Sequence, residues 1–182
     1  YYLGDNVAFE AFKACAFDLR LENDAKNWAT RYIGKNFDNH CNIKEEQKNE
    51  SAQDTRWLAF NIQRPVFKDR RVREAVTLAF DFEWMNKALF YNAWSRTNSY
   101  FLNTKYVSRT YPDSDELVLL ATMKKDLPPE VFTHIYQPPV SNGAYYEREN
   151  LLKADALFTT SGCIINGQQR FNSFTGQPLT LQ

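Results

Sequence analysis

The sequence predicts a mixed α/β fold, and three observations carry this prediction. Apolar residues recur at helical spacing in some segments and alternate at strand spacing in others, so both kinds of element are expected. Residues 55–62 are rich in strand formers and apolar on both faces, which is typical of a strand inside a sheet. Asn166 and Gly167 lie between two short strand-like runs, a pattern that predicts a hairpin. At 182 residues, the chain accommodates one ordinary domain or pieces of two.

The first part of the chain predicts a helix, a strand and a second helix. Residues 7–14 have helical spacing and follow an Asp-Asn pair that can cap the helix. Residues 17–22 alternate apolar and charged side chains, as a half-buried strand does. Residues 23–33 predict the second helix, and Gly34 is placed to end it. The polar residues 42–56 then predict a surface connection with at most a short strand.

Two abutting helices are expected after the strand at residues 55–62. Pro65 ends that strand, because proline cannot donate to the hydrogen-bond ladder. Asp69 is placed to cap the first helix, whose apolar residues fall on one face at helical spacing. Asp81 ends this run and caps the next one, so the two helices are expected to meet at a corner.

The middle of the second half predicts a loop followed by a helix. Residues 95–114 have no sustained periodicity and interleave hydroxyl, amide and aromatic side chains, which is typical of an ordered functional loop. Asp113 and Glu116 resemble a capping box in front of a helix over residues 117–127. The proline pair at 128–129 is expected to stop that helix.

The C-terminal part predicts an extended stretch, a helix and a hairpin. Residues 135–146 are proline-rich, with a turn near their end. Residues 147–162 have helical spacing, and their final glycine is placed to end the helix. The hairpin turn at Asn166 follows, and a further strand is expected to begin at Pro178.

Composition excludes some functions and favours others. The 22 basic and 22 acidic side chains cancel, so the chain lacks the basic surplus that drives nucleic-acid binding. The 10 Tyr, 14 Phe and 4 Trp exceed what a minimal core needs, which favours a binding cleft or an interface. Because no run of about 18 apolar residues occurs, we expect no membrane-spanning helix.

The sequence offers little support for catalysis, a metal or a cofactor. His40 and His134 lack metal-ligand spacing, and neither a nucleophile elbow nor a phosphate-cradling glycine loop occurs. Cys15, Cys41 and Cys163 are odd in number and widely spaced, so we expect isolated thiols. We therefore expect no catalytic residue, no metal and no cofactor.

Residues 49–101 carry a signature that resembles a known family. Its elements are a strand ending in Phe-Asn, a Pro-x-Phe, an Asp-x-Arg-Val-Arg-x-Ala and a helix that begins at an Asp. The matching residues are Phe60, Asn61, Pro65, Phe67, Asp69, Arg71, Val72, Arg73, Ala75 and Asp81. This signature resembles that of periplasmic solute-binding proteins of family 5, which deliver peptides to ABC importers. Residues 80–101 and 111–140 resemble the oligopeptide-binding branch still more closely.

The resemblance implies a periplasmic binding protein-like, type II two-lobed architecture. It covers nearly the whole chain, and such proteins are much longer, so we expect an internal fragment of one of them. The end of the first lobe is assigned to residues 1–54, the hinge strand and crossover to 55–66, and the beginning of the second lobe to 67–182.

The resemblance also implies a function. Such a protein would capture an oligopeptide between its lobes without chemistry and pass it to an inner-membrane ABC permease. It would be a periplasmic monomer without cofactor, whose parent protein carries a signal peptide. The alternative is a non-catalytic protein-interaction module with an aromatic-rich interface.

Two groups of residues are candidates for ligand contacts. Trp57 and Asn61 lie on one face of the expected hinge strand and offer a flat apolar wall and an amide. The alternative for Trp57 is an ordinary core position. Arg71 and Arg73 are two apart on one helix and face different directions, so we expect ion pairs or solvent exposure rather than a ligand clamp.

The second group lies in and before the loop at 95–114. Arg96, Asn98 and Tyr100 are suited to a peptide carboxylate, a backbone carbonyl and an apolar side chain, respectively. Tyr91 and Trp94 belong to the same neighbourhood. The alternative is a solvated loop whose aromatic residues dock on their own domain.

Overall fold

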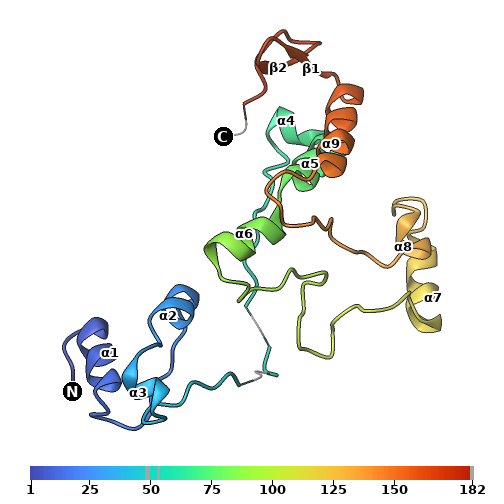
Figure 1. The fold of residues 1–182 in the computed structure, drawn as a ribbon. Helices are drawn as coiled ribbons and strands as arrows, with labels where there is room; N and C mark the ends of the chain where they lie inside the picture. The colour runs from blue at the N-terminus through green and yellow to red at the C-terminus, as the bar shows by residue number, and fades with distance from the viewer. Residues whose placement is uncertain (48–49, 53, 181–182) are drawn as a thin grey trace. The chain divides into compact units, whose positions relative to one another are not determined.

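A computed structural model of the chain describes residues 1–47, 50–52 and 54–180 (Figure 1). These residues form helices and a two-stranded antiparallel sheet, which confirms the mixed α/β class. The chain divides into two compact units, one comprising Tyr1–Asn49 with Met85–Ser95 and the other Glu50–Trp84 with Arg96–Gln182. The helices of the described part include none that is long and apolar enough to cross a membrane.

An aromatic cluster forms the core of the first unit. Helices α1 (Asp5–Lys13), α2 (Ala25–Thr30) and α3 (Lys35–Asp38) surround it. The cluster consists of buried Phe9, Phe12 and Tyr32, with Phe17, Trp28 and Phe37 packed against them. Their rings meet at tilted or edge-on angles, the arrangement that aromatic pairs prefer.

A buried polar network closes one side of this cluster. Arg20 Nε donates to Tyr32 Oη at 3.1 Å, and Tyr32 Oη donates to Glu22 Oε2 at 2.9 Å. Arg20 Nη2 also lies 2.8 Å from Asp5 Oδ1. Burial raises the pKa of the Tyr32 phenol, and the bond to Asp5 raises the pKa of the Arg20 guanidinium. Each charged group therefore has a partner, as burial requires.

The expectation of three isolated thiols is wrong for two of the cysteines. Cys15 and Cys41 form a disulfide, whereas Cys163 is free and buried. Asn42 explains the encounter, because its Nδ2 donates to the carbonyl oxygen of Phe12 at 3.1 Å and so holds the segment after α3 against the end of α1. The spacing of the cysteines along the sequence does not predict that these two segments meet.

The second unit is built around one helix pair. Helix α5 (Arg70–Ala79) lies alongside α9 (Arg148–Thr160), and α4 (Pro65–Lys68) precedes α5 (Figure 1). The buried residues of this core are Phe67, Val72, Ala75, Ala154, Phe158 and Cys163. Strands β1 (Cys163–Asn166) and β2 (Gln169–Asn172) follow α9 as an antiparallel hairpin. Gly167 lies in the turn between these strands with φ 65°, a conformation that favours glycine. The predicted hairpin is therefore confirmed.

The signature arginines have structural roles, as predicted. Arg71 pairs with Asp69 at 2.6 Å, and its Nη1 donates to the carbonyl oxygen of Thr160 at 2.6 Å, at the end of α9. Arg73 Nη1 donates to the carbonyl oxygen of Phe67 at 2.6 Å. The two side chains therefore tie α4, α5 and α9 together through helix-end carbonyl groups.

The predicted caps of the remaining helices are confirmed in two places. Asp81 Oδ1 accepts from the backbone N–H of Trp84 at 2.9 Å, at the start of α6 (Phe82–Leu89). Asp113 and Glu116 form the predicted capping box of α7 (Ser114–Thr122). The predicted end of this helix is wrong, because it stops at Thr122, and α8 (Glu130–Thr133) forms separately after the prolines.

Three smaller predictions also need correction. Gly4, not the Asp-Asn pair, occupies the N-cap of α1. Helix α2 ends at Thr30, and Gly34 instead precedes α3 with φ 115°. At the C-terminal end, the expected further strand amounts to a single bridge between Phe171 and Pro178, and residues 181–182 lie outside the described part.

Two predicted strands do not form. Residues 17–22 and 55–62 are irregular, although their side-chain patterns suit strands. A strand requires a neighbour for its backbone groups, and neither segment pairs with another strand of the described chain. For the surface connection at 42–56, the described residues contain no strand, and residues 48–49 and 53 lie outside them. The assignment of residues to two lobes stays a prediction.

Candidate functional site

An exposed aromatic pair joins two of the predicted site residues. The ring centroids of Trp57 and Tyr100 lie 4.8 Å apart at an interplanar angle of 29°, so the rings stack. Trp57 is 50% exposed and Tyr100 is 77% exposed, so the pair lies on the surface and not in a hydrophobic core. A stacked indole and phenol offer a flat apolar surface with polar edges, the combination that binding surfaces use.

Asn61 lies in the turn that leads from this aromatic pair into α4. Its Oδ1 accepts from the backbone N–H of Gln63 at 3.0 Å, and its backbone carbonyl accepts from Arg64 N–H at 3.1 Å. The side-chain carbonyl is therefore used locally to shape the turn. The ligand-binding role assigned to Asn61 stays a prediction.

Arg96 fastens one segment of the second unit to another. Its Nη1 donates to the carbonyl oxygen of Pro139 at 2.9 Å, and its guanidinium lies 5.6 Å from the Phe80 ring and 5.7 Å from the Phe82 ring. These contacts occupy some of the guanidinium N–H donors that we predicted to bind a peptide carboxylate. The predicted carboxylate contact is untested by this arrangement.

The loop after Arg96 is ordered by its own hydroxyl groups. Thr97 Oγ1 donates to the carbonyl oxygen of Ser99 at 2.7 Å, and Ser99 is buried although it is polar. Asn98 and Tyr100, on either side of Ser99, are exposed. Because buried Ser99 orders the backbone of this loop, less conformational entropy remains to be lost when Asn98 and Tyr100 bind a ligand.

Tyr91 and Trp94 belong to the first unit, apart from the other candidates. Tyr91 is 41% exposed and adopts the left-handed region at φ 53°. The ring of Trp94 lies 4.8 Å from that of Phe90. The structure thus brings Trp57 and Tyr100 together, and it places Tyr91 and Trp94 in one short turn of the other unit.

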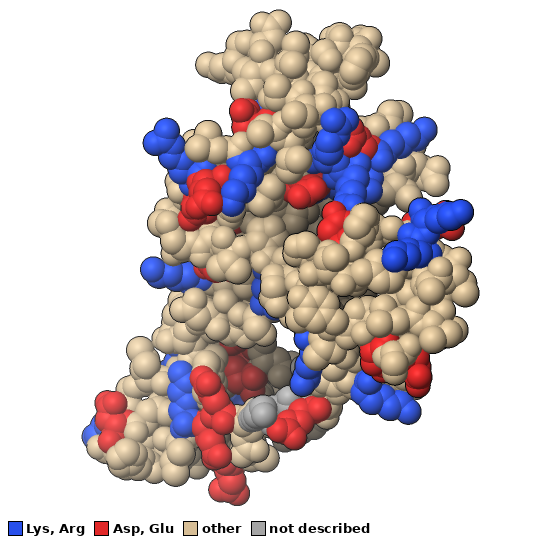
Figure 2. Space-filling model, turned by 90° about the vertical axis from the view of Figure 1, so that its right-hand side faces the viewer, with Lys and Arg blue, Asp and Glu red and all other residues tan. Residues whose placement is uncertain are grey.

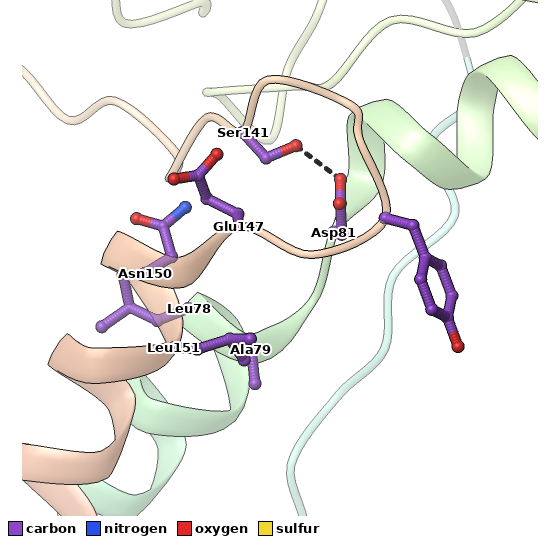
Figure 3. A pocket seen from close by; sticks show the side chains of 8 residues that line it. Leu78, Ala79, Asp81, Ser141, Glu147, Asn150 and Leu151 are labelled. Atoms are coloured by element: carbon purple, nitrogen blue, oxygen red, sulfur yellow. Dashed lines mark hydrogen bonds between the residues drawn. The ribbon is translucent and has the colours of Figure 1, made fainter.

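A small hollow that sequence reasoning missed lies between α5 and the segment before α9 (Figure 3). Its lining residues are Leu78, Ala79, Asp81, Ser141, Tyr145, Glu147, Asn150 and Leu151. Its volume of about 20 Å³ is far below the roughly 300–1,000 Å³ of most ligand pockets. The hollow is therefore too small to enclose a peptide.

Hydrogen bonds around the hollow fasten the segment before α9. Ser141 Oγ donates to Asp81 Oδ1 at 2.5 Å (Figure 3). The backbone N–H of Ser141 donates to Glu83 Oε2 at 3.0 Å. Asn150 Nδ2 donates to the carbonyl oxygen of Val140 at 3.0 Å. The sequence signal was the turn at Asn142 and Gly143, but it did not show which elements the turn contacts.

The same segment presents two further aromatic residues that sequence reasoning missed. Tyr145 meets Trp84 edge-on, with the ring centroids 4.7 Å apart. Tyr145 is 65% exposed and its neighbour Tyr146 is 70% exposed. Because they follow a proline-rich stretch without periodicity, their only sequence signal is their residue type.

Residues 1–47, 50–52 and 54–180 contain no group of three or more His, Cys, Asp or Glu that could hold a metal ion. His134 Nδ1 lies 2.7 Å from Thr133 Oγ1, a local contact at the end of α8. Figure 2 shows positive and negative side chains interspersed on one face, in keeping with the balanced charge.

Comparison with known proteins places these features in a family. The family model of bacterial extracellular solute-binding proteins, family 5 Middle, matches residues 1–181. The Escherichia coli (strain K12) protein YejA is 78% identical over the whole chain.

Two proteins of Agrobacterium fabrum (strain C58 / ATCC 33970) are more distant relatives. The probable peptide-binding protein YejA is 33% identical over 100% of this chain, and the peptidoglycan-binding protein YepA is 30% identical over 92% of it. The chain spans 30% of the length of each YejA protein and 29% of YepA.

Proposed function

Because the chain belongs to family 5 of the bacterial extracellular solute-binding proteins, we propose that it is part of a periplasmic receptor for oligopeptides. The receptor captures a peptide between two lobes and delivers it to an inner-membrane ABC permease. Family membership supports the binding role, and the name of the Agrobacterium fabrum relative, a probable peptide-binding protein, supports the peptide ligand.

The exposed stack of Trp57 on Tyr100 carries the proposal within this chain. Its flat face suits apolar side chains of a peptide, and its polar edges suit peptide N–H and C=O groups. Asn98 lies in the same ordered loop and supplies an amide for the ligand main chain. Arg96 and Asn61 lie four residues from Tyr100 and Trp57, respectively, along the chain, and we assign them secondary contacts.

We extend the proposal to the lobes as the sequence suggested them. Residues 1–54 end the first lobe, 55–66 form the hinge and crossover, and 67–182 begin the second lobe. We assign Tyr91 and Trp94, in their own turn of the first unit, ligand contacts as well. Closure of two lobes on a ligand about such a hinge is a common mode of domain motion.

The proposed compartment is the periplasm. Disulfides persist in oxidising compartments and are rare in the cytosol, and the Cys15–Cys41 bond supports this placement. The receptor is proposed to be a monomer and to act by binding alone, with no cofactor.

A second ligand class is supported by the relative named peptidoglycan-binding protein YepA. Such a ligand would combine a short peptide with sugar rings, and exposed aromatic side chains offer apolar faces with polar edges to either part. A protein-interaction module with an aromatic interface is the remaining alternative, and it requires no small ligand.

Identification of the natural ligand distinguishes these classes. The full-length protein is purified from the periplasm without denaturation, then unfolded in acid, and the released small molecules are analysed by mass spectrometry. Short peptides support the main proposal, and peptides with amino sugars support the second. Release of a different class of metabolite contradicts both.

A further inference from the structure

One side chain fastens the turn that carries Tyr91 and Trp94. Asn86, in the last turns of α6, donates from Nδ2 to the carbonyl oxygen of Trp94 at 2.7 Å. Its Oδ1 accepts from the backbone N–H of Trp94 at 3.1 Å. Both halves of the amide are thus bonded to the same residue, so the backbone of Trp94 is fixed in position and in orientation.

The backbone of Asn86 fastens the same turn a second time. Its carbonyl oxygen accepts from the N–H groups of Phe90 and Asn92, each at 3.0 Å. Within this turn, Tyr91 and Asn92 adopt left-handed backbone conformations, with φ 53° and 61°. Such conformations cost free energy for residues other than glycine and persist where surrounding contacts hold them.

The consequence is a fixed presentation of aromatic side chains. The Trp94 ring lies on Phe90 at 4.8 Å between centroids, and Tyr91 is left 41% exposed at the tip of the turn. Asn86 itself is half-buried and uses its polar atoms on Trp94. It is therefore suited to hold ligand-contacting residues and not to contact the ligand.

We propose that Asn86 is a positioning residue that holds Trp94 and Tyr91 in the geometry that binds peptide. This inference rests on the ligand-binding role proposed above for those two aromatic residues. The role requires an amide, because aspartate lacks the donor to the Trp94 carbonyl and alanine lacks both groups. Pre-organised contacts bind more tightly because less ordering remains for the ligand to induce.

The test uses the full-length receptor and a synthetic pool of short peptides of mixed sequence in titration calorimetry. We expect Asn86→Ala and Trp94→Ala each to weaken binding by roughly ten-fold, the size of a moderate hot spot. The double variant is expected to bind no more weakly than Trp94→Ala alone, because Asn86 acts through Trp94. Asn86→Asp keeps the side-chain size but sets a carboxylate oxygen against the Trp94 carbonyl oxygen, so it should also weaken binding. Lys87→Ala, exposed on the same helix, serves as the matched control.

Four outcomes would overturn the inference. Wild-type affinity in Asn86→Ala with a lower melting temperature would mean that Asn86 only stabilises the fold. Additive losses in the double variant would mean that Asn86 acts independently of Trp94. Loss of binding in Tyr100→Ala but not in Trp94→Ala would remove the turn from the site and leave the proposed function intact, whereas a wild-type receptor that binds no peptide would remove both.

Discussion

Trp57 and Tyr100 show that sequence alone leaves the surroundings of an aromatic residue open to two interpretations. Strand-like spacing could not decide whether Trp57 is core or surface, because exposure depends on what packs over it. The structure leaves both rings exposed and stacked on each other. Local signals did better, since the caps Asp69 and Asp113 contact backbone groups only two or three residues away.

Removal of the Tyr100 ring tests the aromatic surface directly. Tyr100→Ala is expected to weaken peptide binding by the full-length receptor by about ten-fold, because aromatic contacts in binding sites commonly act as hot spots. Tyr136→Ala removes another exposed tyrosine of the same unit and should leave affinity unchanged. Calorimetric titration measures both, and equal affinities for the two variants would contradict the assignment.

The ion pair of Asp69 with Arg71 predicts a pH dependence of stability. Bonding to Arg71 lowers the pKa of the Asp69 carboxyl in the folded state. The ion pair therefore contributes fully to the free energy of unfolding above the ordinary pKa of an aspartate. This contribution is lost as the pH falls through the lower pKa that Asp69 has in the folded state. Because both side chains are partly exposed, the effect is expected to be below about 1 kcal/mol.

Thermal melts of the full-length protein between about pH 2 and 6 check this dependence. The stability difference between wild type and Asp69→Asn should shrink as the pH falls into the acid range. A difference that is constant across this range would show that Asp69 stabilises the fold only as a hydrogen-bonding cap.

At the scale of elements, helices were predictable and isolated strands were not. Helices α1, α2, α5, α6, α7 and α9 and the final hairpin overlap the segments that spacing and turn residues predicted, although several helix ends differ. These elements satisfy their backbone groups within or next to the same segment. Residues 55–62 have the side-chain pattern of a strand but do not form one. A strand needs a neighbouring strand for its backbone hydrogen bonds, and the pattern of a single segment does not show whether such a neighbour exists.

The disulfide between α1 and the segment after α3 should stabilise the first unit. It closes a loop with a sequence separation of 26, for which the chain-entropy model gives about 3.5 kcal/mol. Reduction with dithiothreitol is therefore expected to lower the free energy of unfolding by about that amount in denaturant titrations.

Two variants sharpen this test. Cys15→Ser should be less stable than wild type under oxidising conditions and should show no further response to the reductant. Cys163→Ala removes the free thiol, so it should keep the full response. A wild-type protein that is equally stable in both redox states would contradict a structural role for the bond.

At the scale of the whole molecule, composition excluded more than it identified. Balanced charge argued against nucleic acid, and aromatic content favoured a binding surface, but neither indicated a ligand. The ordered signature from Phe60 to Asp81 identified the family, which the match over residues 1–181 confirms. That signature is made largely of structural contacts, since Arg71 and Arg73 bind helix-end carbonyl groups, so it reports the fold more directly than the ligand.

The central claim is that this chain forms part of a peptide receptor. Its most direct test is titration calorimetry of the full-length wild-type protein with a pool of short peptides, alongside its melting temperature with and without the pool. We predict saturable binding and a higher melting temperature with peptide, because a ligand that binds only the folded state stabilises it. Absence of binding heat together with an unchanged melting temperature would contradict the claim and favour an interaction module without a small ligand.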